Sequence, residues 1–113
     1  MENKVTKEEM KALPKILAVD FDGTLVTDCY PAIGVIRNKL WKKVLKYRKK
    51  GWKLILWTCR DGEQLHAAIA FCYVNGLEFD SHNKNIVEVR EMFNNDTRKV
   101  YATKYLDDKS IEC

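Results

Sequence analysis

The stretch KILAVDFDGTLV, residues 15–26, decides the fold. Its apolar run from Ile16 to Val19 does not alternate with polar residues, which predicts a strand buried on both faces of a parallel sheet. Two carboxylates, Asp20 and Asp22, follow the strand and precede Gly23. An Asp-Gly pair is typical of a turn, but carboxylates at positions i and i+2 of an extended chain also point to the same side, where they could share a metal ion or a proton. The rest of the sequence has to distinguish a plain turn from a chemical site.

The 113-residue chain has the length and composition of one globular domain, which we expect to span residues 1–113. Apolar residues make up 46% of the chain and charged residues 32%, so disorder is not predicted. No apolar run approaches the ~18 residues of a membrane span, and the charged beginning lacks the apolar segment of a signal peptide. We therefore expect a cytoplasmic protein without a membrane partner.

Further strands and helices alternate along the chain. Apolar residues at helical spacing predict an amphipathic helix from Ile33 to Gly51, and residues 53–57 predict a second buried strand. Next come a helix with Asp61 as its N-cap that ends at residues 75–76, a short strand at 77–80, a helix at 84–93 and a fourth strand at 100–106. This alternation predicts an α/β, three-layer Rossmann-like fold with a small parallel sheet and helices on both faces.

Polar side chains gather where the predicted strands end, which is where open parallel sheets bind their ligands. The first strand is followed by Asp20 and Asp22, the second by Thr58 and Arg60, and the fourth by Asp107 and Asp108. Four carboxylates in one crevice would repel one another unless a cation neutralised them, and an all-oxygen set suits Mg²⁺. A phosphorylated substrate could then bind the open side of the metal.

Several groups could bind the phosphoryl oxygens of such a substrate. The hydroxyl of Thr58 is one of them, and the guanidinium of Arg60 either is a second or caps local structure. The backbone N–H groups around Asp22 to Thr24, which include Gly23, are a further set. One carboxylate could attack phosphorus while the other transfers a proton to the leaving oxygen.

DFDGTLV, the strand that ends in Thr58, and the LDD at residues 106–108 together resemble the haloacid dehalogenase-like (HAD) superfamily of phosphohydrolases. The resemblance covers residues 15 to 109, nearly the whole chain. It implies Asp20 as nucleophile, Asp22 as general acid and base, and Thr58 as phosphate binder. It also implies Mg²⁺ held by Asp20, the backbone carbonyl of Asp22, and Asp107 with or without Asp108. The carboxylate of Asp22 resembles the phosphatase pattern, not those of dehalogenases or transport ATPases.

The family also uses a lysine beside the phosphate, for which the chain offers Lys84, Lys99 and Lys104. Lys99, at the start of the fourth strand, would lie roughly 25 Å from Asp107, at the wrong end of the sheet. Lys104 sits inside that strand at an odd offset from Asp107. Lys84 follows the carboxyl end of the third strand and is the expected lysine, with Lys99 as the alternative if the fourth strand is shifted.

The segment from Arg37 to Lys53 contains no acidic residue and carries three interleaved aromatic residues. It could dock nucleic acid, or it could be the solvated face of a helix whose lysine stems cover apolar surface.

Two departures from the HAD pattern shape the expected function. No segment is long enough for the lid domain of many relatives, so we expect an open site, which a homo-oligomer could close. The chain stops five residues after Asp108, where relatives usually add a strand and a helix, so the sheet is either minimal or completed by another subunit. The expected function is a Mg²⁺-dependent phosphatase that acts on a phosphomonoester through an aspartyl-phosphate. The alternatives are a nucleic-acid end-processing phosphatase and a non-catalytic phosphate-binding or partner-binding module.

Overall fold

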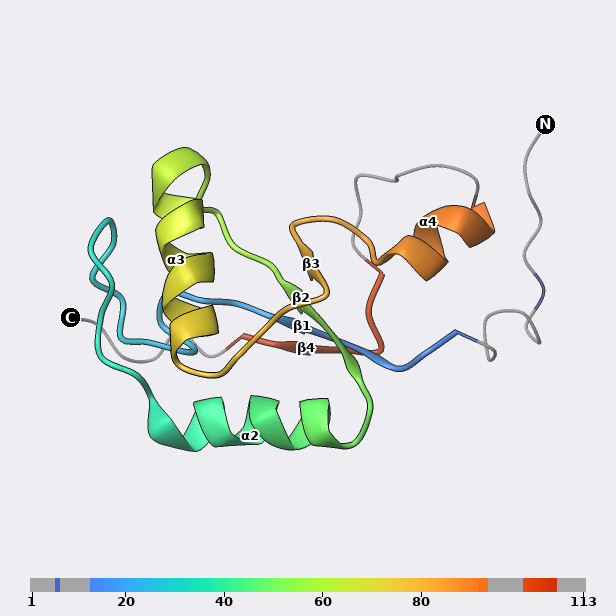
Figure 1. Ribbon diagram of the computed structural model, residues 1–113, viewed down its shortest axis with the longest axis horizontal. Coiled ribbons are helices and arrows are strands. Elements are labelled where there is room, and N and C mark those ends of the chain that lie inside the picture. The colour runs from blue at the N-terminus through green and yellow to red at the C-terminus, as the bar shows by residue number, and fades with distance from the viewer. Residues whose placement is uncertain (1–5, 7–12, 94–100, 108–113) are drawn as a thin grey trace.

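The computed structural model describes residue 6, residues 13–93 and residues 101–107 (Figure 1). In chain order its elements are β1 Ile16–Val19, α2 Asn38–Lys49, β2 Lys53–Leu56, α3 Gly62–Val74, β3 Ser81–His82, α4 Val87–Phe93 and β4 Lys104–Leu106. The strands pair in parallel in the order β3-β2-β1-β4. The predicted α/β Rossmann-like fold is confirmed.

One face of the sheet carries the larger core. Leu17 and Val19 of β1 and Leu54 and Leu56 of β2 point to this face, where α2 and α3 pack against them. The helices contribute buried residues that recur at helical spacing: Trp41 and Val44 from α2, and Ala68 and Cys72 from α3. This spacing places one stripe of each helix against the sheet and leaves the opposite stripe in water.

The other face of the sheet carries a smaller core, which α4 and the loop before it cover. Ile16, Ala18 and Ile55 point to this face and pack with Ile86 and Val89. Strand β1 is therefore fully buried on both sides, as its unbroken apolar run predicts. Figure 1 shows α2 and α4 on opposite sides of the strands, which confirms the three-layer arrangement.

The prediction of a strand at residues 77–80 is wrong, because the structure has no strand there. Leu77 and Phe79 are instead core residues, and the ladder with β2 begins only at Ser81, which pairs with Ile55. The side chain of Asp80 accepts a hydrogen bond of 2.8 Å from the backbone N–H of Leu54, which holds this segment beside β2 before the strand starts. The alternating pattern of 77–80 thus reflects packing into the core.

Other element boundaries also move. The helix predicted from Ile33 begins only at Asn38, because the chain before it turns back on residues 25–27 through hydrogen bonds from Thr27 N–H to the Val35 carbonyl and from Arg37 N–H to the Leu25 carbonyl. Helix α3 has Asp61 at its N-cap position, but the expected side-chain capping bond is not formed. The fourth strand is shorter than predicted, and residue 100 of that prediction lies outside the described residues.

No helix in the described part of the chain is long and apolar enough to cross a membrane.

Candidate active site at the carboxyl edge of the sheet

The carboxyl ends of β1, β2 and β4 meet at Asp20. The backbone N–H of Asp20 donates to the Leu106 carbonyl at 3.0 Å, and the N–H of Trp57 donates to the Val19 carbonyl at 2.8 Å. These bonds place Asp20 between the chain that leaves β2 and the chain that leaves β4. A pocket of about 230 Å³ opens there, and it is lined by Ala18, Asp20, Trp57, Thr58, Cys59, Tyr105, Leu106 and Asp107. The structure therefore brings Asp20, Thr58 and Asp107 together in this pocket, which we call the catalytic pocket.

A second pocket of about 350 Å³ adjoins the first and is called the loop pocket here. It is lined by Asp20, Asp22, Asp28, Tyr30, Thr58, Cys59 and Arg60. Asp20 and Thr58 line both pockets, so they stand where the two meet. A group bound at Asp20 can thus extend toward the Asp107 side or toward the Asp22 side.

Arg60 and Asp22 form a two-pronged ion pair in the wall of the loop pocket. Nε and Nη2 of Arg60 each donate to a different carboxylate oxygen of Asp22 at 2.7 Å. The Arg60 side chain is only 1% exposed, and the hydrogen bond to Asp22 is the main cause that raises its pKa above the usual value. Charge-assisted bonds in this parallel geometry are among the strongest in proteins. Both carboxylate oxygens of Asp22 are thus held by one residue.

The remaining donors of Arg60 bind the loop that follows Asp22. Nη2 donates to the Ala32 carbonyl at 2.8 Å and Nη1 to the Pro31 carbonyl at 3.2 Å. The guanidinium carbon also lies 5.1 Å from the ring centre of Tyr30. These contacts correct the expectation that Arg60 binds substrate: its donors are directed to Asp22 and to loop carbonyls, so Arg60 positions Asp22 and the loop.

The turn after Asp22 corrects the expectation that its backbone N–H groups bind phosphate. The N–H of Gly23 donates to the Val26 carbonyl at 2.8 Å, and the N–H of Thr24 donates to the Phe21 carbonyl at 3.2 Å. Thr24 is fully buried, and Gly23 has a φ of 85°, which favours glycine. The N–H groups expected to bind phosphate therefore close the turn, and Gly23 and Thr24 shape the site from behind.

Thr58 is held by a residue that the sequence analysis did not single out. The backbone N–H of Thr58 donates to Oδ1 of Asn83 at 2.8 Å, and the N–H of Asn83 donates to the Leu56 carbonyl at 2.8 Å. Asn83 has a φ of 53°, a region that asparagine enters more readily than most residues. The hydroxyl oxygen of Thr58 accepts the Arg60 N–H at 3.1 Å and can still donate its own hydrogen. The signal in the sequence that could have identified Asn83 is an asparagine directly after a short strand.

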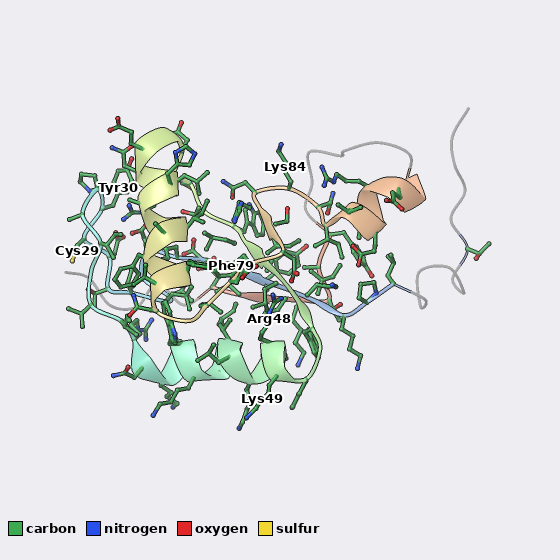
Figure 2. All side chains as sticks on the ribbon, viewed as in Figure 1. Cys29, Tyr30, Arg48, Lys49, Phe79 and Lys84 are labelled. Carbon is green, nitrogen blue, oxygen red and sulfur yellow. The ribbon has the colours of Figure 1, made fainter. Side chains whose placement is uncertain are left out.

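The expected lysine does not line either pocket. Lys84 is exposed on the loop after β3, and Figure 2 shows its side chain reaching outward from that loop. Nζ of Lys104 instead lies 3.3 Å from the hydroxyl of Tyr47 on α2. Lys99 lies outside the described residues. The choice of Lys84 over Lys99 stays a prediction.

The expected carboxylate set is only partly assembled in the described residues. Asp20 and Asp107 line the catalytic pocket, Asp22 is neutralised by Arg60, and Asp108 lies outside the description. Within residues 13–93 and 101–107, no group of three or more His, Cys, Asp or Glu side chains is arranged to hold a metal ion. Mg²⁺ commonly binds through one or two carboxylates and keeps several waters. The pair of Asp20 and Asp107 fits this requirement.

Comparison with known proteins finds one informative relative. The chain is similar to a solved structure described as that of a conserved protein from Bacteroides thetaiotaomicron, with a TM-score of 0.74 and 37% sequence identity. The match covers 87% of this chain and 78% of the other. No protein-family model and no curated protein matches the chain. The similarity shows a shared family and fold, and the description of that relative assigns no activity.

Proposed function

The chain belongs to the same family as the conserved Bacteroides thetaiotaomicron protein, and we propose that it is a lidless HAD-type phosphatase that hydrolyses a phosphomonoester. One observation carries the proposal: Asp20, Thr58 and Asp107, from three separate strand ends, line one pocket at the carboxyl edge of a parallel sheet. This edge is where α/β sheets of this kind bind their ligands.

Asp20, Thr58 and Asp107 each have a role in the proposed reaction. The carboxylate of Asp20 attacks phosphorus, the bond from phosphorus to the leaving oxygen breaks, and an aspartyl-phosphate forms. The hydroxyl of Thr58, a residue whose backbone N–H is held by Asn83, donates to a phosphoryl oxygen. Mg²⁺ would be held by Asp20, Asp107 and the backbone carbonyl of Asp22, with or without Asp108, and would neutralise charge on the phosphate.

Asp22 is the proposed general acid and base. It protonates the leaving oxygen in the first half of the reaction. In the second half it takes a proton from the water that attacks phosphorus, the bond from phosphorus to the Asp20 oxygen breaks, and inorganic phosphate is released. Since both of its oxygens accept bonds from Arg60, Asp22 must exchange one of those bonds for the leaving oxygen or the water. Arg60 therefore acts as a positioning residue that keeps the carboxylate beside the nucleophile.

The expected substrate follows from the openness of the site. The two pockets meet at Asp20 without a lid domain in the described residues, so large phosphorylated groups can approach. Lys84 is proposed to reach the phosphate from the loop after β3. A cytoplasmic location and closure of the site by a second copy of the chain are parts of the same proposal.

The first experiment is hydrolysis of para-nitrophenyl phosphate by wild type and Asp20→Asn. The proposal expects turnover that requires Mg²⁺, is abolished by chelation, and is lost in Asp20→Asn because the nucleophile is gone. Asp61→Asn is the matched control, since it makes the same substitution at an exposed position outside both pockets. Turnover that survives in Asp20→Asn, or that does not respond to Mg²⁺, would contradict the proposal.

A second candidate is a phosphate-binding module without turnover. The observation that favours it is the engagement of both Asp22 oxygens by buried Arg60, which leaves no acid free to assist a leaving group in this arrangement. The two candidates differ in one measurement: the module binds inorganic phosphate with Mg²⁺, measured by calorimetry, and releases none from a phosphomonoester.

A further inference from the structure

Four lysines of α2 and Lys50, the residue that caps its C-terminal end, lie on one exposed stripe, which we call the lysine face. With Tyr47 they line a groove of about 480 Å³: Lys39, Lys42, Lys43, Lys46 and Lys50. Their spacing of three and four residues brings them to the same side of the helix. The groove is separate from the catalytic pocket and from the loop pocket, because it shares no lining residue with either.

The positive charge of this face is not balanced locally. No acidic residue occurs from Arg37 to Lys53. Among the described residues, none of the five lysines takes part in a salt bridge, whereas Arg48 on another side of the helix pairs with Asp80 at 2.6 Å. Like charges at i and i+4 destabilise a helix, and the face contains three such lysine pairs: 39 with 43, 42 with 46, and 46 with 50. Lys46 and Lys50 lie at the C-terminal end, where the helix dipole favours cations, but Lys39, Lys42 and Lys43 lie too far from that end to gain from it.

Coverage of apolar surface does not account for the lysine face. The apolar side chains of α2 that enter the core, Trp41 and Val44, are 5% and 0% exposed and are already covered by the sheet and α3. The lysines lie on the outward stripe. Tyr47 is the one core-packed aromatic residue that lines the groove with them, so among the described residues the lysine stems shield at most this ring. A solvated face alone would gain from interspersed acidic residues.

We propose that the lysine face binds the phosphodiester backbone of a nucleic acid. From Lys39 to Lys50 the stripe spans 11 helical rises, or about 17 Å, which is long enough to contact several phosphates of one backbone. Lysine ammonium groups bind phosphates as point charges, which suits a regular row of anions. A membrane surface fits less well, because an interfacial helix needs a free apolar face and that of α2 is buried in the core.

The lysine face leads to the candidate active site. Helix α2 begins just after Arg37, whose Nη1 donates at 2.6 Å to the Gly23 carbonyl in the turn that follows Asp22. In Figure 1, α2 runs from this end of the sheet along one of its faces. A nucleic acid on the lysine face would therefore have one end near Asp20. This link to catalysis rests on the proposed function, whereas the binding itself does not.

The test is binding of fluorescein-labelled oligonucleotides, single-stranded and duplex, followed by fluorescence anisotropy over a salt series. The affinity of wild type should fall steeply with salt, since each neutralised phosphate contributes a slope of about −0.7 for single strands and −0.9 for a duplex. The double variant Lys42→Gln/Lys46→Gln should reduce the steepness of that slope by about 1.5. Lys42→Arg/Lys46→Arg should keep it.

The matched control is Lys15→Gln/Lys53→Gln, which removes the same charge from two lysines that do not line the groove and should leave the slope unchanged. All variants should fold, because Lys→Gln on α2 removes repulsion, and their thermal unfolding verifies this. Three results would overturn the proposal. They are an equal loss of salt slope in the two Lys→Gln double variants, the absence of salt-sensitive oligonucleotide binding by wild type, and stronger binding of wild type to anionic phospholipid vesicles than to oligonucleotides. Hydrolysis of para-nitrophenyl phosphate should be the same in all of them, so failure of the proposed activity and failure of the binding proposal are separate results.

Discussion

Replacing Arg60 with methionine tests whether the ion pair with Asp22 holds the site together. The variant keeps an apolar stem of similar length but removes the bidentate bonds to Asp22 and the bonds to the Pro31 and Ala32 carbonyls. Removing one partner of a buried ion pair costs about 3–5 kcal/mol, because the other charge stays buried without compensation. The Asp22 side chain is 16% exposed, so water relieves part of this penalty. We expect Arg60→Met to lower the free energy of unfolding by about 3 kcal/mol.

Urea unfolding measures this loss, and a double-mutant cycle assigns it to the pair. Asp22→Asn alone leaves Arg60 as a buried charge opposite a neutral amide, so it should also destabilise the protein. The combined variant Asp22→Asn/Arg60→Met removes both charges and should be less destabilised than the sum of the single variants, by about 2 kcal/mol.

Arg48→Met is the control for this experiment. Arg48 pairs with Asp80 at 2.6 Å, close to the 2.7 Å of Arg60 and Asp22, but its side chain is 35% exposed, so solvent screening limits the loss to under about 1 kcal/mol. Equal destabilisation by Arg48→Met and Arg60→Met, or strict additivity in the Asp22 cycle, would refute the view that Arg60 is the positioning residue of the site.

Three further predictions concern stability and reactivity. Gly34→Ala should lower the free energy of unfolding by about 1–3 kcal/mol in urea, because its methyl group would collide with the backbone and hydroxyl of Thr27; a neutral result would contradict the close approach. Burial raises the pKa of the Cys72 thiol to about 12, whereas the Cys59 thiol is exposed. Ellman's reagent should therefore react with Cys59 in the native protein and with Cys72 only after unfolding. Cys59→Ser should remove one fast-reacting thiol, and Cys72→Ala should remove none. Burial lowers the pKa of His82 below its usual value of 6.5, so on acidification the unfolded state binds a proton before the folded state does. The free energy of unfolding should therefore fall as the pH drops from above 6.5 toward the lower pKa of the folded state. In urea unfolding, His82→Gln should lose less stability over this pH range than wild type, and an unchanged pH profile would contradict the prediction.

The sequence predicts those features that depend on local pattern and on parallel topology. An unbroken apolar run identifies β1, and the rule that strand ends meet at one edge brings Asp20, Thr58 and Asp107 into one pocket. Both inferences need only residue type and spacing. They do not need the direction of any side chain.

The features that sequence reasoning missed depend on where side chains point. Arg60 and Asp22 are 38 residues apart, and nothing in either segment shows that the guanidinium turns inward to the carboxylate instead of outward to a substrate. The N–H groups of Gly23 and Thr24 are likewise used inside their own turn, a choice fixed by backbone geometry. Residues 77–80 alternate as a strand does, yet Leu77 and Phe79 enter the core before pairing begins.

The charges of the site are handled in two different ways, and this difference separates the roles of its carboxylates. Asp22 has a permanent counter-ion in Arg60, so its charge is balanced whether or not a metal is present. Asp20 and Asp107 share the catalytic pocket, and none of the described residues that line it is basic. Two carboxylates facing one small pocket favour a divalent cation, whereas a carboxylate fixed by a buried arginine is suited to proton transfer at a set position. In the proposed reaction the metal would therefore be held on the Asp107 side of Asp20, and the leaving group would lie on the Asp22 side.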